Sequence, residues 1–139
     1  MRYMSKVTDE LYVGPRLDPE DMKILDKYGI KSILNLTGSV IEGEVWSPIS
    51  DGNSRKHQIH EAVEKLKDLV DKNQIPVYVH CIVGRNRSPL VIATYLVKYK
   101  GFQDLDKALL YVKHMHPKTL PFKNNIETAR LYLLTGMDK

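Results

Sequence analysis

The sequence predicts an α/β fold in which one layered domain, residues 1–139, holds a central, mostly parallel sheet of about four to five strands flanked by helices. Short β-rich segments alternate with longer segments whose apolar residues recur at helical spacing. No repeat, low-complexity tract or Gly/Ser/Pro-rich linker divides the chain. Its 139 residues are enough to bury one core without disulfides.

The first third of the chain predicts a β-α-β unit. Residues 9–14 (DELYVG) and 30–36 (IKSILNL) have the composition of short strands. Between them, a helix is expected over 18–29, because Asp18 can cap it, Pro19 suits its first turn and Gly29 can end it.

Residues 37–53 interrupt this pattern with an irregular loop that holds the only tryptophan, Trp46, and loops of this length are often functional. An amphipathic helix is expected from about Ser54 and a buried strand at 76–80 (PVYVH). The next helix begins at Ser88 and is apolar nearly all round, so it should pack in the middle of the molecule. Two further helices are expected at 104–116 and 124–134.

Composition excludes several classes of protein. A net charge of +4 suits anionic partners but makes nucleic-acid binding unlikely without excluding it. No apolar run resembles a membrane span or a signal peptide, so no membrane partner is expected. One cysteine permits no intramolecular disulfide and favours a reducing, cytoplasmic setting. No cofactor and no metal are expected, and the histidines that could suggest metal ligands should lie on the surface: His57, His60, His114 and His116.

The only cysteine stands in HCIVGRNRS, residues 80–88, where a strand gives way to a helix. Backbone N–H groups converge at such a junction and form a nest for a dianion. Gly84 supplies backbone freedom, and Arg87 adds a planar fork suited to phosphate oxygens. The same field favours the thiolate form of Cys81, which is the nucleophilic form. A buried structural cysteine is the alternative interpretation.

An alkoxide or phenoxide leaving group also needs a proton in the transition state. Asp51, in PISD, is the candidate general acid. On spacing alone, an ordinary aspartate in a Ser-Asp-Gly turn is the favoured interpretation of Asp51. Glu42 and Glu44 lie in the same loop as fallback acids.

The stretch from His80 to Ser88 resembles the H-C-x5-R-S/T motif of the cysteine-dependent protein tyrosine phosphatase superfamily, and it is most similar to the small, atypical dual-specificity branch. LYVG, YGIKSILNL and PISD extend the resemblance over most of the chain. The resemblance implies that Cys81 attacks phosphorus, Arg87 binds the phosphoryl group, Ser88 assists release of the cysteine, Asp51 is the acid and His80 orders the loop. Ser88 could equally be an ordinary helix N-cap. The implied substrate-binding loop comprises Ile82, Val83, Gly84, Arg85, Asn86 and Arg87.

Ile82 and Val83 are bulkier than usual for that family, and Arg85 and Asn86 are less usual. The expected function is hydrolysis of phosphotyrosine, with phosphoserine and phosphothreonine, through a phosphocysteine intermediate. Phosphorylated proteins are the expected partners, and the monomer is favoured. The alternatives are an RNA 5′-phosphatase or phosphoinositide phosphatase, suggested by Arg85 and Asn86, and a non-catalytic phosphate-binding module.

Overall fold

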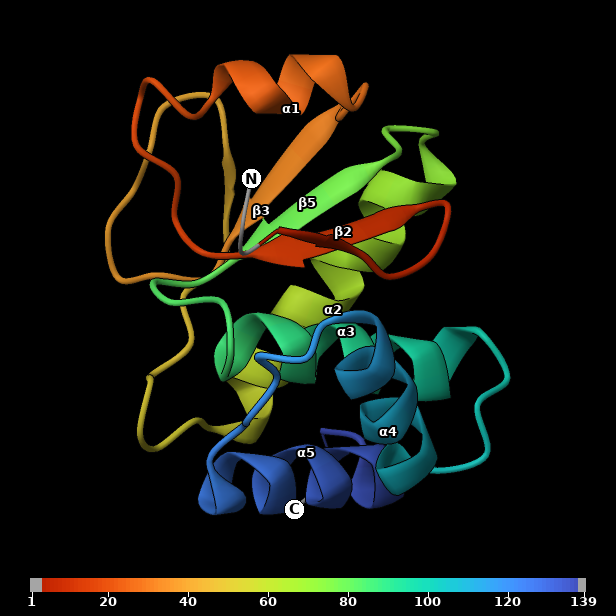
Figure 1. Ribbon diagram of the computed structural model, residues 1–139. Helices are drawn as coiled ribbons and strands as arrows, with labels where there is room; N and C mark the ends of the chain where they lie inside the picture. Colours follow the sequence, from red (N-terminus) through yellow and green to blue (C-terminus); the bar gives the residue numbers. More distant parts are fainter. Residues whose placement is uncertain (1–3, 138–139) are drawn as a thin grey trace.

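The computed structural model describes residues 4–137 and contains a five-stranded sheet in the order β1-β2-β5-β3-β4 (Figure 1). β2, β5, β3 and β4 run parallel, and β1 pairs antiparallel with β2 at one edge. The predicted fold class, a mostly parallel sheet flanked by helices, is therefore confirmed. The strands are β1 (Ser5–Lys6), β2 (Leu11–Gly14), β3 (Ser32–Asn35), β4 (Val45–Trp46) and β5 (Val77–His80).

The register of the three central strands positions the functional region. β5 lies between β2 and β3, and His80 at its end is opposite both Gly14 and Asn35. The carboxyl ends of all three strands therefore lie at the same edge of the sheet. Open α/β sheets bind their ligands at this edge. The segments that leave the strands there begin at Pro15, Leu36 and Cys81.

Helices cover both faces of the sheet, with α1 on one face and the other four on the opposite face (Figure 1). Alternation along the strands explains the two layers, because successive side chains point to opposite faces. Tyr12, Tyr78 and Ile33 pack with α1, whereas Val79 and Leu34 belong to the larger core. The helices are α1 (Lys23–Lys27), α2 (Lys56–Asp71), α3 (Arg87–Tyr99), α4 (Leu105–Met115) and α5 (Lys123–Thr135).

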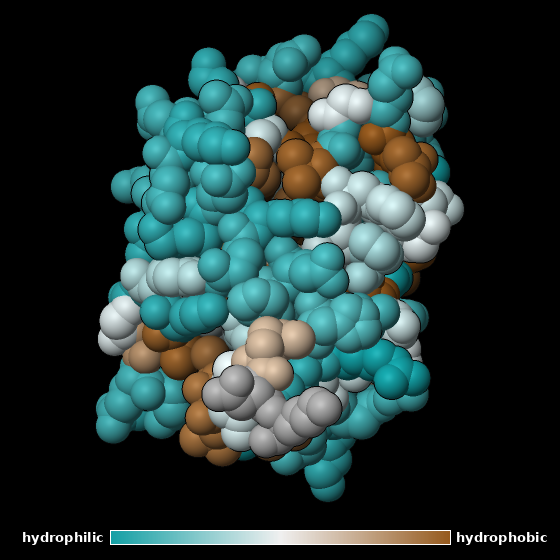
Figure 2. Space-filling model, turned by 180° about the vertical axis from the view of Figure 1, so that it is seen from behind, coloured by the Kyte–Doolittle hydropathy of each residue, from teal (hydrophilic) through white to brown (hydrophobic). Residues whose placement is uncertain are grey.

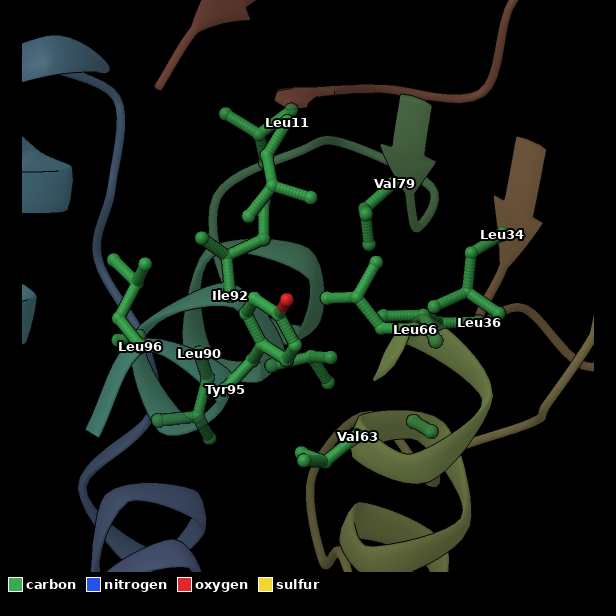
Figure 3. Close-up of a cluster of buried hydrophobic side chains, with 14 of the residues drawn as sticks. Leu11, Leu34, Leu36, Val63, Leu66, Val79, Leu90, Ile92, Tyr95 and Leu96 are labelled. Atoms are coloured by element: carbon green, nitrogen blue, oxygen red, sulfur yellow. The ribbon is translucent and has the colours of Figure 1, made fainter. Parts of the chain in front are cut away.

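α3 is the central helix of the larger layer. It contacts α2, α4, α5 and the sheet, and its residues 87–96 are all buried, which confirms the prediction that an all-round apolar helix packs in the middle. Figure 3 shows Ile92 and Leu96 of α3 among side chains of the sheet and of α2. Full burial of one such side chain stabilises the fold by about 1.5–3 kcal/mol. This packing holds the amino end of α3 in place against the end of β5.

Two local predictions differ from the structure. The helix expected over 18–29 begins only at Lys23, because the backbone of 19–22 forms turns on the carbonyl groups of Asp18 and Pro19 instead of a regular helix. The loop over 37–53 is not fully irregular, since Val45 and Trp46 pair with β3 as an edge strand. The other predicted helices and strands are confirmed, with ends that shift by one or two residues.

The surface is mainly hydrophilic on the face opposite to that of Figure 1, where apolar areas form separate patches (Figure 2). None of the helices within residues 4–137 has the length and apolar composition needed to cross a bilayer.

Candidate active site

The loop between β5 and α3, residues 81–86, is held from outside through its carbonyl groups. The carbonyl oxygens of Cys81, Ile82, Gly84 and Arg85 each accept a hydrogen bond from a group outside the loop, so these oxygens point away from the centre of the loop. The amide groups of residues 82–86 donate to no backbone or side-chain acceptor within the described chain. They are therefore left for an anion, as in other backbone nests. The four bonds are His80 Nδ1 to Cys81 O (3.2 Å), Arg16 N to Ile82 O (3.1 Å), His116 Nε2 to Gly84 O (2.6 Å) and Leu120 N to Arg85 O (2.7 Å).

His116 was expected on the surface, and this prediction is wrong, because its side chain is only 1% exposed. Its Nε2–H donates to the carbonyl oxygen of Gly84, which can only accept, so Nδ1 accepts from the Ser5 hydroxyl at 2.7 Å. Burial lowers the pKa of His116 below its usual value. Burial therefore favours a neutral imidazole, which acts as a structural support for the loop.

Gly84 has the backbone freedom that the sequence predicted. Its φ is +84°, a conformation that side chains disfavour. A Cβ at this position would also lie 2.5 Å from the carbonyl carbon of Gly14 at the end of β2. The loop therefore packs directly on the neighbouring strand.

The thiol of Cys81 lies inside this loop and is 2% exposed. Its Sγ is 3.2 Å from the hydroxyl oxygen of Ser88, which is fully buried in the first turn of α3. Ser88 is not the N-cap, because α3 begins at Arg87 and Asn86 occupies the cap position without a side-chain cap bond. The Ser88 hydroxyl instead faces the sulfur.

The guanidinium of Arg87 is held at one end and open at the other. Nη1 donates to the carbonyl oxygens of Ile49 (3.0 Å) and Leu36 (3.3 Å), which fixes the plane of the group. Nε lies 3.2 Å from Asp51 Oδ1, yet its N–H is not directed at that oxygen and has no hydrogen-bond partner in the described part of the chain. A buried donor without a partner is costly. Nε–H is therefore available to a phosphoryl oxygen.

Asp51 lies over the amino end of α3, with its side chain 61% exposed. The side-chain amide of Asn86 donates to both the backbone oxygen and Oδ1 of Asp51, each at 2.8 Å. Asn125 at the start of α5 donates to the same backbone oxygen at 2.7 Å. The candidate acid is thus attached to the catalytic loop and to α5.

The imidazole of His80 lies behind the loop. Its Nδ1–H donates to the carbonyl oxygen of Cys81, and Nε2 is 2.7 Å from Oε1 of Glu44. The His80 and Glu44 side chains are 2% and 4% exposed. This buried contact occupies Glu44, so it is not a substitute for Asp51 as the acid. Glu42, the other fallback, is exposed in the turn before β4.

Cys81, Arg87 and Asp51 line one small cavity of about 140 Å³. A groove of about 450 Å³ between α4 and α5 is larger, but it is lined mainly by apolar side chains and contains no nucleophile. The chemistry therefore belongs to the smaller cavity. Its remaining walls are Ile82, Val83, Arg85, Asn86 and Phe122.

The structure thus brings together almost all of the residues that the sequence singled out. Gly84 contributes no side chain to the cavity wall, and its positive φ shapes the backbone of the loop. Three residues of the site were not identified from the sequence: His116, Asn125 and Phe122. Glu44 was identified only as a fallback acid and not as the partner of His80. None carries a local signal, because each reaches the loop through a contact between distant segments.

Comparisons with known proteins agree with this geometry. A family model described as the catalytic domain of dual specificity phosphatases matches residues 11–132. The protein-tyrosine-phosphatase MKP1 of Arabidopsis thaliana is 31% identical over 121 residues, which cover 78% of this chain and 15% of that protein. Human dual specificity protein phosphatase 5 is 29% identical over 119 residues, covering 80% of this chain and 30% of its own length. The chain therefore spans less than half of these relatives.

Solved structures share the fold. A mouse putative dual specificity phosphatase complexed with zinc tungstate superposes with a TM-score of 0.81 at 23% identity, covering 96% of this chain and 87% of that one. The human tyrosine phosphatase-like serine/threonine/tyrosine-interacting protein superposes with a TM-score of 0.80 at 17% identity, covering 96% and 97%. The order of elements, the cysteine loop and the family match lead to one conclusion: the chain belongs to the dual specificity phosphatases and carries their catalytic domain.

Proposed function

We propose that the protein hydrolyses phosphomonoesters on proteins through a phosphocysteine intermediate, with phosphotyrosine preferred over phosphoserine and phosphothreonine. The observation that carries this proposal is the single cavity that Cys81, Arg87 and Asp51 share. A nucleophile, an anion-binding cation and a proton donor are the three groups that such a reaction requires. Phosphorylated proteins in general are the substrates that the phosphatase relatives imply.

In the first step the Cys81 thiolate attacks phosphorus, and the bond from phosphorus to the ester oxygen breaks. Asp51 donates its proton to that oxygen, so the alcohol or phenol leaves neutral. The amide groups of the loop and Nε–H of Arg87 hold the phosphoryl oxygens while their charge redistributes.

In the second step water attacks phosphorus and transfers a proton to the Asp51 carboxylate. The S–P bond breaks, inorganic phosphate forms and the thiolate returns. The Ser88 hydroxyl, 3.2 Å from Sγ, stabilises the departing sulfur by a hydrogen bond.

The walls of the cavity support the preference for phosphotyrosine. Ile82, Val83 and Phe122 are each close to half exposed and form an apolar rim suited to an aromatic ring. A phenoxide also leaves more readily than an alkoxide. Phosphoserine and phosphothreonine are therefore proposed as the slower substrates, because each would leave as an alkoxide.

The test is a profile of the wild type beside Cys81→Ser and Asp51→Asn, using 4-nitrophenyl phosphate and a phosphotyrosine peptide at mildly acidic pH. Cys81→Ser should abolish turnover and retain phosphate binding, because the loop amides and Arg87 remain. Asp51→Asn should lower kcat/KM for the phosphotyrosine peptide by about 10²–10⁴-fold, the usual contribution of a general acid, and should lower it less for 4-nitrophenyl phosphate, whose leaving group is stable as an anion. No hydrolysis of either substrate by the wild type would refute the proposal.

A second candidate rests on Arg85, which is exposed at the rim of the cavity. Its charge favours substrates with more anionic groups than phosphotyrosine, such as an RNA 5′-triphosphate or a phosphoinositide. PTPMT1, a structure of the same fold at 14% identity, is described in complex with PI(5)P. Assaying these substrates beside the phosphopeptide ranks the classes by kcat/KM. A faster reaction with either one would replace the protein substrate.

We also propose a reducing compartment, the cytoplasm, as the working location. A thiolate nucleophile must stay unoxidised, and Cys81 is the chain's only cysteine, so it has no intramolecular partner for a protective disulfide. Imaging of a tagged protein in its own cell checks this location, and a signal confined to an oxidising compartment would contradict it.

A further inference from the structure

Asn86 immediately precedes the arginine of the catalytic loop, and its side chain bonds the acid loop and the residues around the start of α5. All of its hydrogen-bonding capacity is used by protein groups. Nδ2 donates to the backbone oxygen and to Oδ1 of Asp51, each at 2.8 Å. Oδ1 accepts from the backbone N–H of Phe122 at 2.8 Å and from Nδ2 of Asn125 at 3.3 Å.

The chemistry of the partners sets the orientation of this amide. The backbone N–H of Phe122 can only donate, and the backbone oxygen of Asp51 can only accept. The two ends of the Asn86 amide therefore cannot be exchanged without losing both bonds. Aspartate, serine or glycine at position 86 cannot supply the donor pair that reaches Asp51.

Asn125 anchors the same network on α5 and is fully buried. Its Oδ1 accepts from the backbone N–H of Ser54 at 3.0 Å and from the Ser54 hydroxyl at 2.9 Å. Its Nδ2 donates to the backbone oxygen of Asp51 at 2.7 Å. The acid loop is thus bonded at Asp51 and at Ser54, on both sides of the exposed residues Gly52 and Asn53.

We propose that Asn86 is a positioning residue that, with Asn125 as its anchor, holds the Asp51 carboxyl over Cys81 before substrate binds. A buried and fully bonded amide pair restricts movement of the loop. The acid is therefore preorganised, and its approach does not depend on loop closure around the substrate. This inference rests on the proposed phosphatase function and adds a role for a residue expected only to bind phosphate.

A positioning role for the acid makes a specific kinetic prediction. Proton donation matters most when the leaving group is a poor one, and it matters little when the leaving group is stable as an anion. Asn86→Ala should therefore lower kcat/KM for phenyl phosphate by about 10–100-fold, a part of the full contribution of a general acid. For 4-nitrophenyl phosphate the loss should be under about 5-fold. The quantity kcat/KM is the relevant one because it reports the step in which the leaving group departs.

Asn125→Asp is the second variant, because it keeps the oxygen that accepts from Ser54 and removes the donor that bonds both Asp51 and Asn86. It should shift the ratio of the two kcat/KM values in the same direction as Asn86→Ala. Asn53→Ala, an exposed asparagine in the bend next to Asp51, is the matched control and should leave the ratio unchanged. Inhibition by inorganic phosphate should be altered less than about 3-fold in all three, because the loop amides and Arg87 remain.

The decisive measurement is the combination with Asp51→Asn. Once the acid is absent, Asn86→Ala should have no further effect on the ratio, because its target has been removed. Equal losses for both phosphate esters, or an additive effect in the double variant, would overturn the positioning role. Different results would refute the proposed function itself. These are a wild type that hydrolyses neither ester, or an Asp51→Asn variant that loses kcat/KM equally for phenyl phosphate and 4-nitrophenyl phosphate. If Asn86→Ala does not fold, the same criteria apply to Asn125→Asp.

Discussion

Gly84 offers the sharpest test of how the catalytic loop is built, because the chain contains a matched control. Gly84 has φ of +84° and Gly101, which follows α3, has φ of +78°. Alanine at either position carries the cost of a left-handed backbone, about 1–2 kcal/mol. At position 84 the new methyl carbon would lie 2.5 Å from the carbonyl carbon of Gly14 and 2.6 Å from the nitrogen of Pro15, whereas at position 101 no atom of residues 4–137 lies within 4 Å of it.

The contacts at position 84 are with backbone atoms, so a side-chain rotation cannot relieve them. Overpacking of this kind costs about 1–3 kcal/mol beyond the backbone strain. Gly84→Ala should therefore lower the free energy of unfolding by about 2–5 kcal/mol, and Gly101→Ala by about 1–2 kcal/mol. The difference between the two variants isolates the contact with the end of β2.

Urea unfolding of the wild type and both variants measures these free energies. Inhibition by inorganic phosphate and kcat/KM measure the consequence for the loop. A displacement of about 1 Å at a catalytic group can lower the rate 10²-fold, so Gly84→Ala should lose activity where Gly101→Ala does not. Equal stability of the two variants, with unchanged phosphate inhibition, would refute the close packing of the loop on β2.

Three further predictions concern buried groups. Tyr95 is fully buried in α3, and its hydroxyl has no hydrogen-bond partner within residues 4–137. Tyr95→Phe should therefore raise the free energy of unfolding by up to about 1 kcal/mol. Tyr132→Phe is the comparison and should lower the free energy of unfolding, because it removes hydrogen bonds to His60 and Lys98. Burial raises the pKa of Tyr95 to about 12, whereas the tyrosine of the unfolded chain loses its proton near pH 10. The free energy of unfolding should therefore fall as the pH rises from about 10 towards 12, and it should fall less steeply in Tyr95→Phe. Identical plots of unfolding free energy against pH for the wild type and Tyr95→Phe would contradict this. Glu44→Ala should cost about 1–3 kcal/mol, because it leaves a buried ring nitrogen of His80 without its partner, and Glu44→Gln should cost clearly less because it retains a hydrogen-bonding group; equal losses in thermal or urea unfolding would show that this contact does not support the loop.

The helices and strands were predictable where the local pattern is strong. Residues 77–80 are β-branched or aromatic and bounded by a proline and a loop, and residues 90–97 (LVIATYLV) are apolar nearly all round, so both elements follow from composition. β1 and β4 have two residues each and exist only through pairing with a neighbouring strand. Sequence periodicity cannot reveal an element of that length.

The candidate site divides in the same way. The stretch from His80 to Ser88 contains a nucleophile, a cation and a hydroxyl within one strand–loop–helix junction, so local spacing was sufficient to find them. Asp51 was found through its resemblance to a family pattern, since its own surroundings equally suggest a turn. The contacts that hold these residues join segments 32 residues apart for His116 and Gly84, 36 for Glu44 and His80, and 74 for Asn125 and Asp51.

The sequence by itself determined the fold class, the central helix and the chemical groups of the cysteine loop, because these depend on side-chain type and on spacing along a few turns of chain. Only the tertiary structure decided which distant groups accept, donate and pack around that loop. In the tertiary structure Glu44, a possible acid from the sequence, contacts His80, and His116, expected on the surface, is buried. The side chain of Asn86 donates to Asp51 of the acid loop. The physical reason is that a hydrogen bond between remote segments depends on how the layers pack, which no local pattern encodes.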